Sequence, residues 1–243
     1  MSFTFTPIQT RIVIPPKDEI WDILDALPTL QDGDILFITS KILAIHQGRC
    51  VPCEGTDKNE LIKQEATHYL PYTHPQGFNV NLTITDNILI AAAGIDASNA
   101  NNHYILWPKN VDALCRQIRD YLCKKHNIKN LGVISTDSHT TPLRYGVIGI
   151  TTGLAGVEPL SDVRGKSDLF GRPLEITQIN QVDALSSMAV LLMGETNECT
   201  PMVLLRGYDK IKFDEKASME NFKIAPEIDL YTPLLSVMTK NEK

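Results

Sequence analysis

The stretch GDILFITSK, residues 33–41, contains an apolar run that predicts a buried strand of the fold. Ile35 to Thr39 form a short run rich in β-branched and aromatic residues, the pattern of a buried strand, and the run opens onto the polar pair Ser40-Lys41. A second run of this kind, Leu131 to Ser135, ends at Thr136-Asp137-Ser138. A carboxylate and a hydroxyl therefore emerge where a rigid strand is predicted to end, and such strand ends often carry functional sites.

The remaining elements are predicted from periodicity and from turn residues on either side of these two runs. We expect strands over residues 3–5, 11–14, 79–85, 88–93, 147–151 and 202–205. We expect helices over residues 20–27, 57–70, 108–126 and 182–193, with Thr56 and Asn110 as N-caps and Gly194 ending the last one. No internal repeat or clear linker divides the chain, so we predict one domain over residues 1–243, in which a division into two subdomains remains open.

Composition limits the classes of function. The chain has 243 residues, 43% of them hydrophobic, and a formal net charge of -6, so it can bury a core and carries no basic footprint for nucleic acid or an anionic membrane. The amino terminus lacks a signal-peptide pattern, and the longest apolar run, Ile88 to Ala93, is too short to span a bilayer. Five cysteines do not suggest a disulfide framework. We expect a cytoplasmic protein with reduced thiols.

Three carboxylates, Asp96, Asp137 and Glu195, each follow an apolar element and stand beside small or hydroxyl residues. Oxygen ligands of this kind suit magnesium or manganese, which take further ligands from water and from the phosphates of a nucleotide. A site with two metal ions and a nucleotide would account for all three together. The alternative is that each carboxylate only caps a turn, because Asp and Ser are common turn residues.

Other motifs are less specific. Arg164, Lys166 and Arg172 form a basic cluster that could hold a carboxylate or phosphate, or could be a solvated surface loop. The segment around Lys166 is not a P-loop, because the required first glycine is replaced by Leu160. The pair Cys50 and Cys53 has the spacing of a redox or half-zinc motif, but no second pair accompanies it. His139, two residues after Asp137, could touch a substrate or belong to a turn.

Several of these segments together resemble the coenzyme F420-0:L-glutamate ligase family, which adds glutamate to a deazaflavin cofactor precursor. The resemblance covers roughly residues 7 to 207. The matching motifs are GD and TSK within residues 33–41, GR at 48–49, AGIDASN at 93–99, GVI and TDS within 132–138, RGK and DLFGR within 164–172, LMGE at 192–195 and LRG at 205–207.

The resemblance implies an α+β fold, with mixed or antiparallel sheets and packed helices, that forms an intertwined homodimer. It implies two divalent metal ions, magnesium or manganese, held by Asp96, Asp137, Ser138 and Glu195. It also implies contacts to GTP, with ATP as the other possible nucleotide, from Thr10, Arg11, Ile12, Ser40, Lys41, Asn99, Met193, Gly194, Thr196 and Asn197. Arg144 and Lys166 are expected to act on the reacting groups.

Two segments depart from the family pattern. Residues 44–47 lack a lysine that typical members carry, and residues 139–144 replace the usual Gly-Arg, so that Arg144 is expected to supply the charge. The changed segments resemble those of relatives proposed to act in folate metabolism. We therefore expect a ligase that joins L-glutamate to a carboxylate of either the deazaflavin precursor or a dihydropteroate or folate, through an acyl phosphate. The alternatives are a non-catalytic nucleotide- or pterin-binding module and a redox protein built on Cys50 and Cys53.

Overall fold

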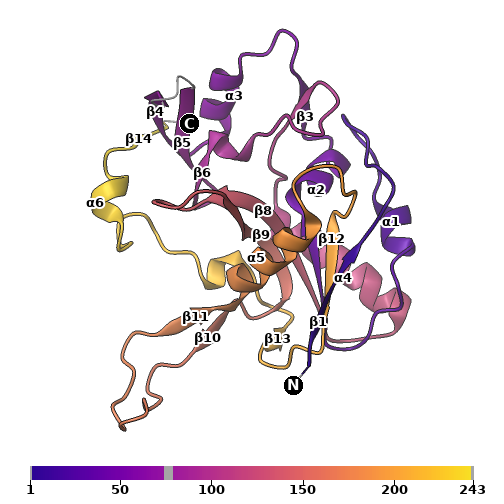
Figure 1. Ribbon diagram of the computed structural model, residues 1–243, viewed down its shortest axis with the longest axis vertical. Coiled ribbons are helices and arrows are strands. Elements are labelled where there is room, and N and C mark those ends of the chain that lie inside the picture. The colour runs from indigo at the N-terminus through magenta and orange to yellow at the C-terminus, as the bar shows by residue number, and fades with distance from the viewer. Residues whose placement is uncertain (1, 74–78, 242–243) are drawn as a thin grey trace.

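The computed structural model describes residues 2–73 and 79–241 and has an α+β fold, which confirms the predicted class (Figure 1). The helices are α1 Trp21–Asp25, α2 Ser40–His46, α3 Lys58–Glu65, η1 Ala92–Gly94, α4 Val111–His126, α5 Gln181–Met193, η2 Met219–Asn221 and α6 Thr232–Leu235. The strands are β1 Thr4–Ile8, β2 Asp34–Thr39, β3 Cys50–Pro52, β4 His68–Thr73, β5 Asn79–Thr85, β6 Ile88–Ala91, β7 His103–Ile105, β8 Leu131–Thr140, β9 Val147–Val157, β10 Leu160–Asp162, β11 Gln178–Asn180, β12 Met202–Arg206, β13 Phe213–Asp214 and β14 Thr239–Lys240.

The main sheet has the strand order β1-β12-β2-β8-β9-β13. Its central pair, β2 and β8, is parallel, and the other pairs among the described strands of this sheet are antiparallel. The parallel register places Thr39 opposite Thr136, so the predicted polar strand ends at Ser40-Lys41 and Asp137-Ser138 lie at the same edge of the sheet. This arrangement brings two functional segments together from distant parts of the sequence.

Both faces of the main sheet are buried at β2, which explains why this strand is a continuous apolar run instead of an alternating one. Leu36 and Ile38 pack into one core with α2 and α4, while Ile35 and Phe37 pack into another core with α5. Figure 1 shows α5 in front of the sheet and α4 behind it. The strand β2, which leads into Lys41 of α2, is therefore fixed from both sides.

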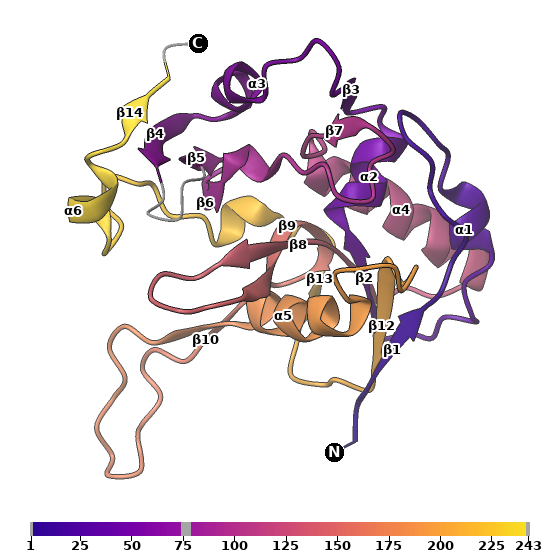
Figure 2. The same ribbon diagram turned by 45° about the horizontal axis from the view of Figure 1, so that its top comes forward.

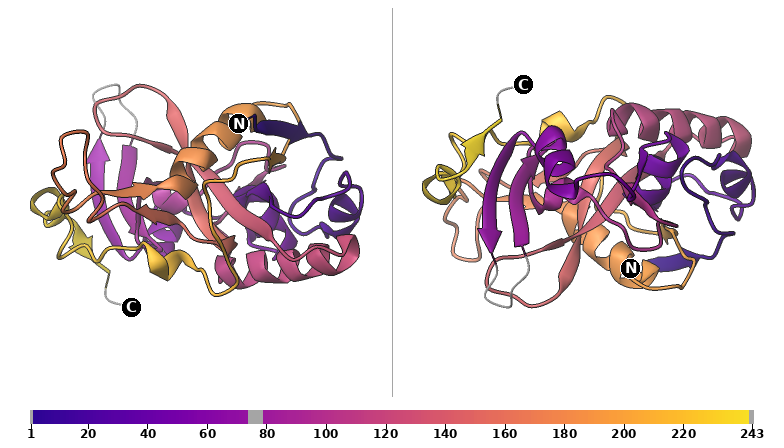
Figure 3. Two further views of the ribbon diagram at one scale, coloured as in Figure 1. Left: turned by 90° about the horizontal axis from the view of Figure 1, so that it is seen from below. Right: turned by 90° about the horizontal axis from the view of Figure 1, so that it is seen from above.

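A second sheet, with the order β14-β4-β5-β6, lies at the end of the molecule opposite α1 (Figure 3). Between β10 and β11 the chain forms an arm, residues 163–177, that projects away from the body (Figure 2). Cross-arm hydrogen bonds keep the arm ribbon-like: Gly165 N–H donates to Leu174 O at 2.8 Å, and Leu174 N–H donates to Lys166 O at 2.9 Å. Among the described residues, no helix is both long and apolar enough to cross a membrane.

Most predicted elements are present, with several corrections. Residues 11–14 do not form a strand, because Arg11 and the backbone N–H of Ile14 bond to the Asp18 carboxylate instead of to a neighbouring strand. The helix predicted over residues 57–70 ends at Glu65, and Asp57, not Thr56, caps it by accepting hydrogen bonds from two backbone N–H groups. The helix predicted over residues 108–126 begins at Val111, and the side chain of Asn110 makes no capping hydrogen bond.

The largest correction concerns residues 136–140, because we predicted that the strand ends at Thr136-Asp137-Ser138. They continue β8, beyond a bulge between Ser135 and Thr136, and pair with β9. The segment after β2 was also incomplete in the prediction, because Ser40 to His46 form α2. Asp137 is thus held by a paired strand and not by a loose loop.

Candidate active site

A pocket of about 340 Å³ opens where β2 and β8 end their parallel pairing. Four other segments complete it: the stretch after β1, the loop after η1, the end of α5 and the loop that leads into β12. The lining includes Thr10, Arg11, Ile12, Val13, Thr39, Lys41, Asp96, Ser98, Asn99, Asp137, Ser138 and all residues from Met193 to Pro201. Ligand sites in sheets with parallel strands commonly lie at this carboxyl edge.

Asp96 and Lys41 form an ion pair on one side of the pocket. The Lys41 ammonium lies 2.6 Å from Asp96 Oδ2 and also donates to the carbonyl and hydroxyl oxygens of Ser98, each at 2.9 Å. Ser98 in turn donates to Asp96 through its backbone N–H at 2.9 Å and through its hydroxyl. Burial opposes ionisation of Asp96, but these hydrogen bonds outweigh it and lower the pKa to about 2.

Asp137 projects from β8 just after the bulge. Its Oδ1 accepts the backbone N–H of Ser138 at 2.8 Å, and its Oδ2 accepts the indole N–H of Trp107. Burial raises the pKa of Asp137 to about 6, even though these two donors favour the ionised form. A positive charge beside Asp137 would therefore stabilise its carboxylate.

Glu195 begins the loop after α5, where Gly194 ends the helix as predicted. Its Oε2 accepts the Ser138 hydroxyl at 3.5 Å, and burial raises its pKa. The φ of +77° at residue 194 favours glycine, and an added Cβ would lie 2.3 Å from the Glu198 carboxyl carbon, so the Glu198 side chain would have to shift. The Glu198 carboxylate in turn accepts the backbone N–H and the hydroxyl of Thr196, which closes the loop on itself.

The pocket brings together most of the residues predicted for the site. The four expected metal ligands line it, as do nine of the ten expected nucleotide contacts: Thr10, Arg11, Ile12, Lys41, Asn99, Met193, Gly194, Thr196 and Asn197. The tenth, Ser40, is buried and lies behind the lining, where its hydroxyl hydrogen-bonds Asp137. The Arg11 guanidinium is engaged by Asp18 and Asp22 and therefore holds the lining segment in place.

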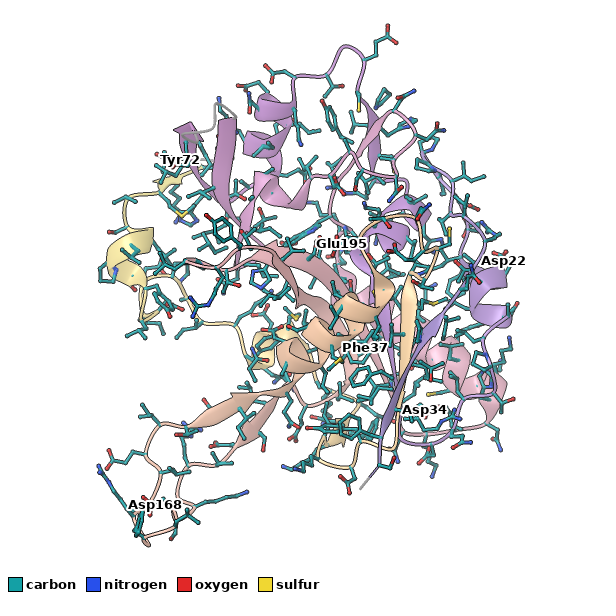
Figure 4. The ribbon with its side chains drawn as sticks, in the orientation of Figure 1. Asp22, Asp34, Phe37, Tyr72, Asp168 and Glu195 are labelled. Carbon is teal, nitrogen blue, oxygen red and sulfur yellow. The ribbon has the colours of Figure 1, made fainter. Side chains whose placement is uncertain are left out.

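Arg144 and Lys166 lie outside this lining. Arg144 is in the exposed connection between β8 and β9, and Lys166 is in the arm. Figure 4 shows the tip of the arm, marked by Asp168, projecting away from the region of Glu195. His139 also lies outside the pocket, on the paired part of β8 opposite Ile148. Within the single chain, neither predicted catalytic residue joins the carboxylates.

Sequence reasoning missed three residues that shape the site. Ser98 could have been found, because a serine two residues after an aspartate commonly forms the local hydrogen bond seen here. Glu198 was within the expected loop, but its role in folding that loop depends on the position of Gly194. No local signal marks Trp107, which reaches Asp137 only in the folded chain.

Comparison with known proteins identifies the family. The family model described as F420-0:Gamma-glutamyl ligase matches residues 7–207 of this chain. The chain belongs to the F420-0:gamma-glutamyl ligase family. Membership makes it a ligase that joins an acid to an amino acid, and the matched residues run from the end of β1 to just beyond β12, so they include every segment of the pocket.

Curated relatives carry the same family relationship. The protein named Coenzyme F420:L-glutamate ligase from Methanopyrus kandleri is 30% identical over 218 residues, which cover 83% of this chain and 85% of that protein. The protein of the same name from Methanocaldococcus jannaschii is 32% identical over 192 residues, 73% of this chain and 77% of its own length. The one from Archaeoglobus fulgidus is 28% identical over 238 residues, 92% of this chain and 94% of its own length.

The fold also brings two family motifs from opposite ends of the matched region into direct contact. Asp34 of the first motif and Arg206 of the last are 172 positions apart, yet the Arg206 guanidinium donates to both Asp34 oxygens, at 2.8 and 2.6 Å. Asp34 is buried and lies on β2, next to the strand β12 that carries Arg206. These two motifs of the F420-0:gamma-glutamyl ligase family thus fasten the central strands together.

Proposed function

We propose that the chain is a nucleotide- and divalent-metal-dependent ligase that forms an amide between L-glutamate and a carboxylate of a cofactor-type acceptor, through an acyl phosphate. The relatives named Coenzyme F420:L-glutamate ligase support the amino acid and an acceptor of the F420 type. GTP or ATP would supply the phosphoryl group.

The charge of the pocket is the observation that carries this proposal. Four carboxylates line it, from Asp96, Asp137, Glu195 and Glu198. Among the described lining residues the cations are Arg11, which is paired with Asp18 and Asp22, and Lys41, whose ammonium faces the pocket carboxylate of Asp96. A polyphosphate would be repelled by this lining unless cations came between them. Divalent metal ions held by these carboxylates would remove the repulsion.

The donor set fits such ions chemically. Asp96, Asp137, Glu195 and the Ser138 hydroxyl are all oxygen donors, as magnesium and manganese prefer. In the described part of the chain, no three His, Cys, Asp or Glu side chains already form a metal-binding group, and the Lys41 ammonium takes the cation position beside Asp96. Asp96, Asp137, Glu195 and Ser138 would hold the ions when the nucleotide is bound.

The mechanism follows from the need to activate a carboxylate, which reacts poorly with amines. When bound, the ions would neutralise charge on the phosphates. An acceptor carboxylate oxygen would bond to the terminal phosphorus as the bond to the leaving nucleoside diphosphate breaks. The glutamate amine would then bond to the acyl carbon, phosphate would leave, and the amine would lose a proton. Lys41, released from Asp96, would contact phosphate, while the strand β8 holds Asp137 in position.

The acceptor would carry the carboxylate that is activated. An F420-type acceptor is the first candidate because of the named relatives. A dihydropteroate or folate is the second, and it is favoured by the segment from His139 to Arg144, which departs from the family pattern and runs from the end of β8 into the exposed β8–β9 connection. Arg144 would contact the acceptor or its product if this connection closes on the pocket.

The same proposal includes a homodimer, in which the arm lies against a second copy. Leu169 and Phe170, at the tip of the arm, are 97% and 95% exposed, an unusual state for large apolar side chains that a second copy would cover. Lys166 on the same arm would then reach the partner rather than its own pocket. Light scattering should give twice 27.1 kDa for the chain and a smaller mass for Phe170→Asp, with Glu175→Gln as the matched arm control.

Mass spectrometry of complete reactions tests the chemistry. Purified protein, magnesium or manganese, GTP or ATP and glutamate are combined with an F420-type precursor, dihydropteroate or a folate. A glutamate-sized gain on one acceptor, with nucleoside diphosphate released only when both glutamate and acceptor are present, would support the ligase. Nucleotide binding with no product on any acceptor would instead favour a non-catalytic binding module. Asp137→Asn should abolish product without unfolding the protein.

A further inference from the structure

Trp107 connects the candidate active site to the interior of the protein. Its side chain is 5% exposed and packs in the core that also contains Ile90, and its indole N–H donates to Asp137 Oδ2. On the other side, the Trp107 carbonyl accepts a hydrogen bond from the Arg49 side chain at 3.1 Å. The residue is therefore held at both its backbone and its ring.

The seat of the indole depends on the absence of a side chain at Gly94. A Cβ at this position would lie 2.2 Å from the indole nitrogen, and the φ of +71° also favours glycine. Gly94 belongs to the same loop as Asp96, another lining carboxylate. The loop can thus lie flat against the ring, which brings Asp96 and the Trp107–Asp137 pair to one pocket.

Three donors fix the orientation of the Asp137 carboxylate. Trp107 holds Oδ2, the backbone N–H of Ser138 holds Oδ1, and the Ser40 hydroxyl also hydrogen-bonds the carboxylate, so rotation would break at least one hydrogen bond. A carboxylate has about four lone-pair sites, so one stays available for a ligand in the pocket. Groups that hold a metal ligand in this way commonly change metal affinity by about 10- to 100-fold when they are removed.

We propose that Trp107 is a positioning residue that presents the Asp137 carboxylate to a divalent cation, an inference that rests on the proposed function. If Trp107 only filled the core, its replacement would lower the stability of the fold but would not weaken cation binding by the folded protein. The indole N–H, in contrast to the ring, should report directly on the occupancy of the site.

The two tryptophans of the chain, Trp21 and Trp107, allow a direct test in the intact protein. In protein labelled with ¹⁵N-tryptophan, Trp21→Phe assigns the two indole N–H resonances. We expect the Trp107 resonance to lie downfield, to move in Asp137→Asn, and to broaden with stoichiometric manganese and nucleotide more strongly than the Trp21 resonance does. A Trp107 resonance that ignores both Asp137→Asn and manganese would overturn the inference.

Manganese affinity, measured from the electron paramagnetic resonance of the free ion with nucleotide present, separates the two levels of the proposal. Trp107→Phe keeps a ring but loses the N–H and should bind manganese about tenfold more weakly or worse. Ile90→Val trims the same core and should bind it normally. Normal affinity in Trp107→Phe would refute the positioning role alone. If the unmodified protein binds no manganese with either nucleotide, the metal-dependent function itself is wrong.

Discussion

Removing the Arg206 guanidinium should destabilise the central sheet. Asp34 is 1% exposed, and it receives two hydrogen bonds from Arg206 and one from the backbone N–H of Gln31 at 2.8 Å. Arg206→Met keeps most of the aliphatic stem but leaves a buried carboxylate without its counter-charge. A stranded buried charge is more costly than the ion pair is favourable, so the effect should be large.

The structure sets the magnitude of this loss. Breaking a buried ion pair by removing one partner costs about 3–5 kcal/mol. We expect the lower end, about 3 kcal/mol, because Gln31 still donates to Asp34 and the Arg206 side chain is 35% exposed, so that water can reach the vacated position. For a chain of this size, about 3 kcal/mol corresponds to a decrease in melting temperature of roughly 6–12 °C.

Urea unfolding and thermal melts of three variants measure the effect. Arg164→Met removes an exposed ion pair between Arg164 in the arm and Asp162 of β10 and should leave the melting temperature unchanged. Asp34→Asn combined with Arg206→Met removes the stranded charge and should recover at least about 1 kcal/mol relative to Arg206→Met alone. A loss below about 1 kcal/mol in Arg206→Met, or a double variant less stable than the single one, would refute the reasoning.

Three further predictions concern the pocket and the cysteines. Because the pKa of Asp137 is raised from 3.8 to about 6 in the folded state, the folded state binds this proton more tightly than the unfolded chain does. The free energy of unfolding of the metal-free protein should therefore decrease as the pH rises from about 4 to 6. Asp137→Asn should lack this decrease when urea midpoints at about pH 4 and pH 7 are compared. Lys41→Met should weaken nucleotide binding by about 10- to 100-fold in calorimetry, since a charge-assisted contact is worth about 1.5–3 kcal/mol; unchanged affinity would remove Lys41 from the phosphate site. Serine at both Cys50 and Cys53, which are free thiols outside the pocket, should retain full ligase turnover, whereas loss of turnover would revive a redox role.

The sequence was most informative where a functional group follows a buried strand or helix. The continuous apolar run before Ser40-Lys41 predicted β2, and the helical spacing before Gly194 predicted α5, so the last residue of each element was placed correctly. Short-range chemistry therefore sufficed to find the carboxylates of the site. Their meeting in one pocket follows from the parallel pairing of β2 with β8, which has no local signal in the sequence.

The wrong predictions have the same physical cause, which is that they concern contacts formed only in the folded chain. Asp137 was predicted at the end of a strand because polar residues follow the apolar run, but pairing with β9 extends the strand past the bulge. Arg144 and Lys166 were chosen for their charge, and charge alone does not tell where the β8–β9 connection and the arm lie. Trp107 was overlooked because its role depends on Gly94 and Asp137, which are neighbours only after folding.

The position of β12 between β1 and β2 has a consequence for biosynthesis. Among the described strands, β1 has β12 as its one neighbour in the main sheet, so it cannot join that sheet before Met202 to Arg206 have left the ribosome. At about 5–20 residues per second, β1 waits roughly 10–40 s after its own synthesis. The segment from Thr10 to Val13, which lines the pocket beside β1, waits with it. Small molecules that occupy the pocket can therefore stabilise the finished chain, but they cannot assist the nascent one.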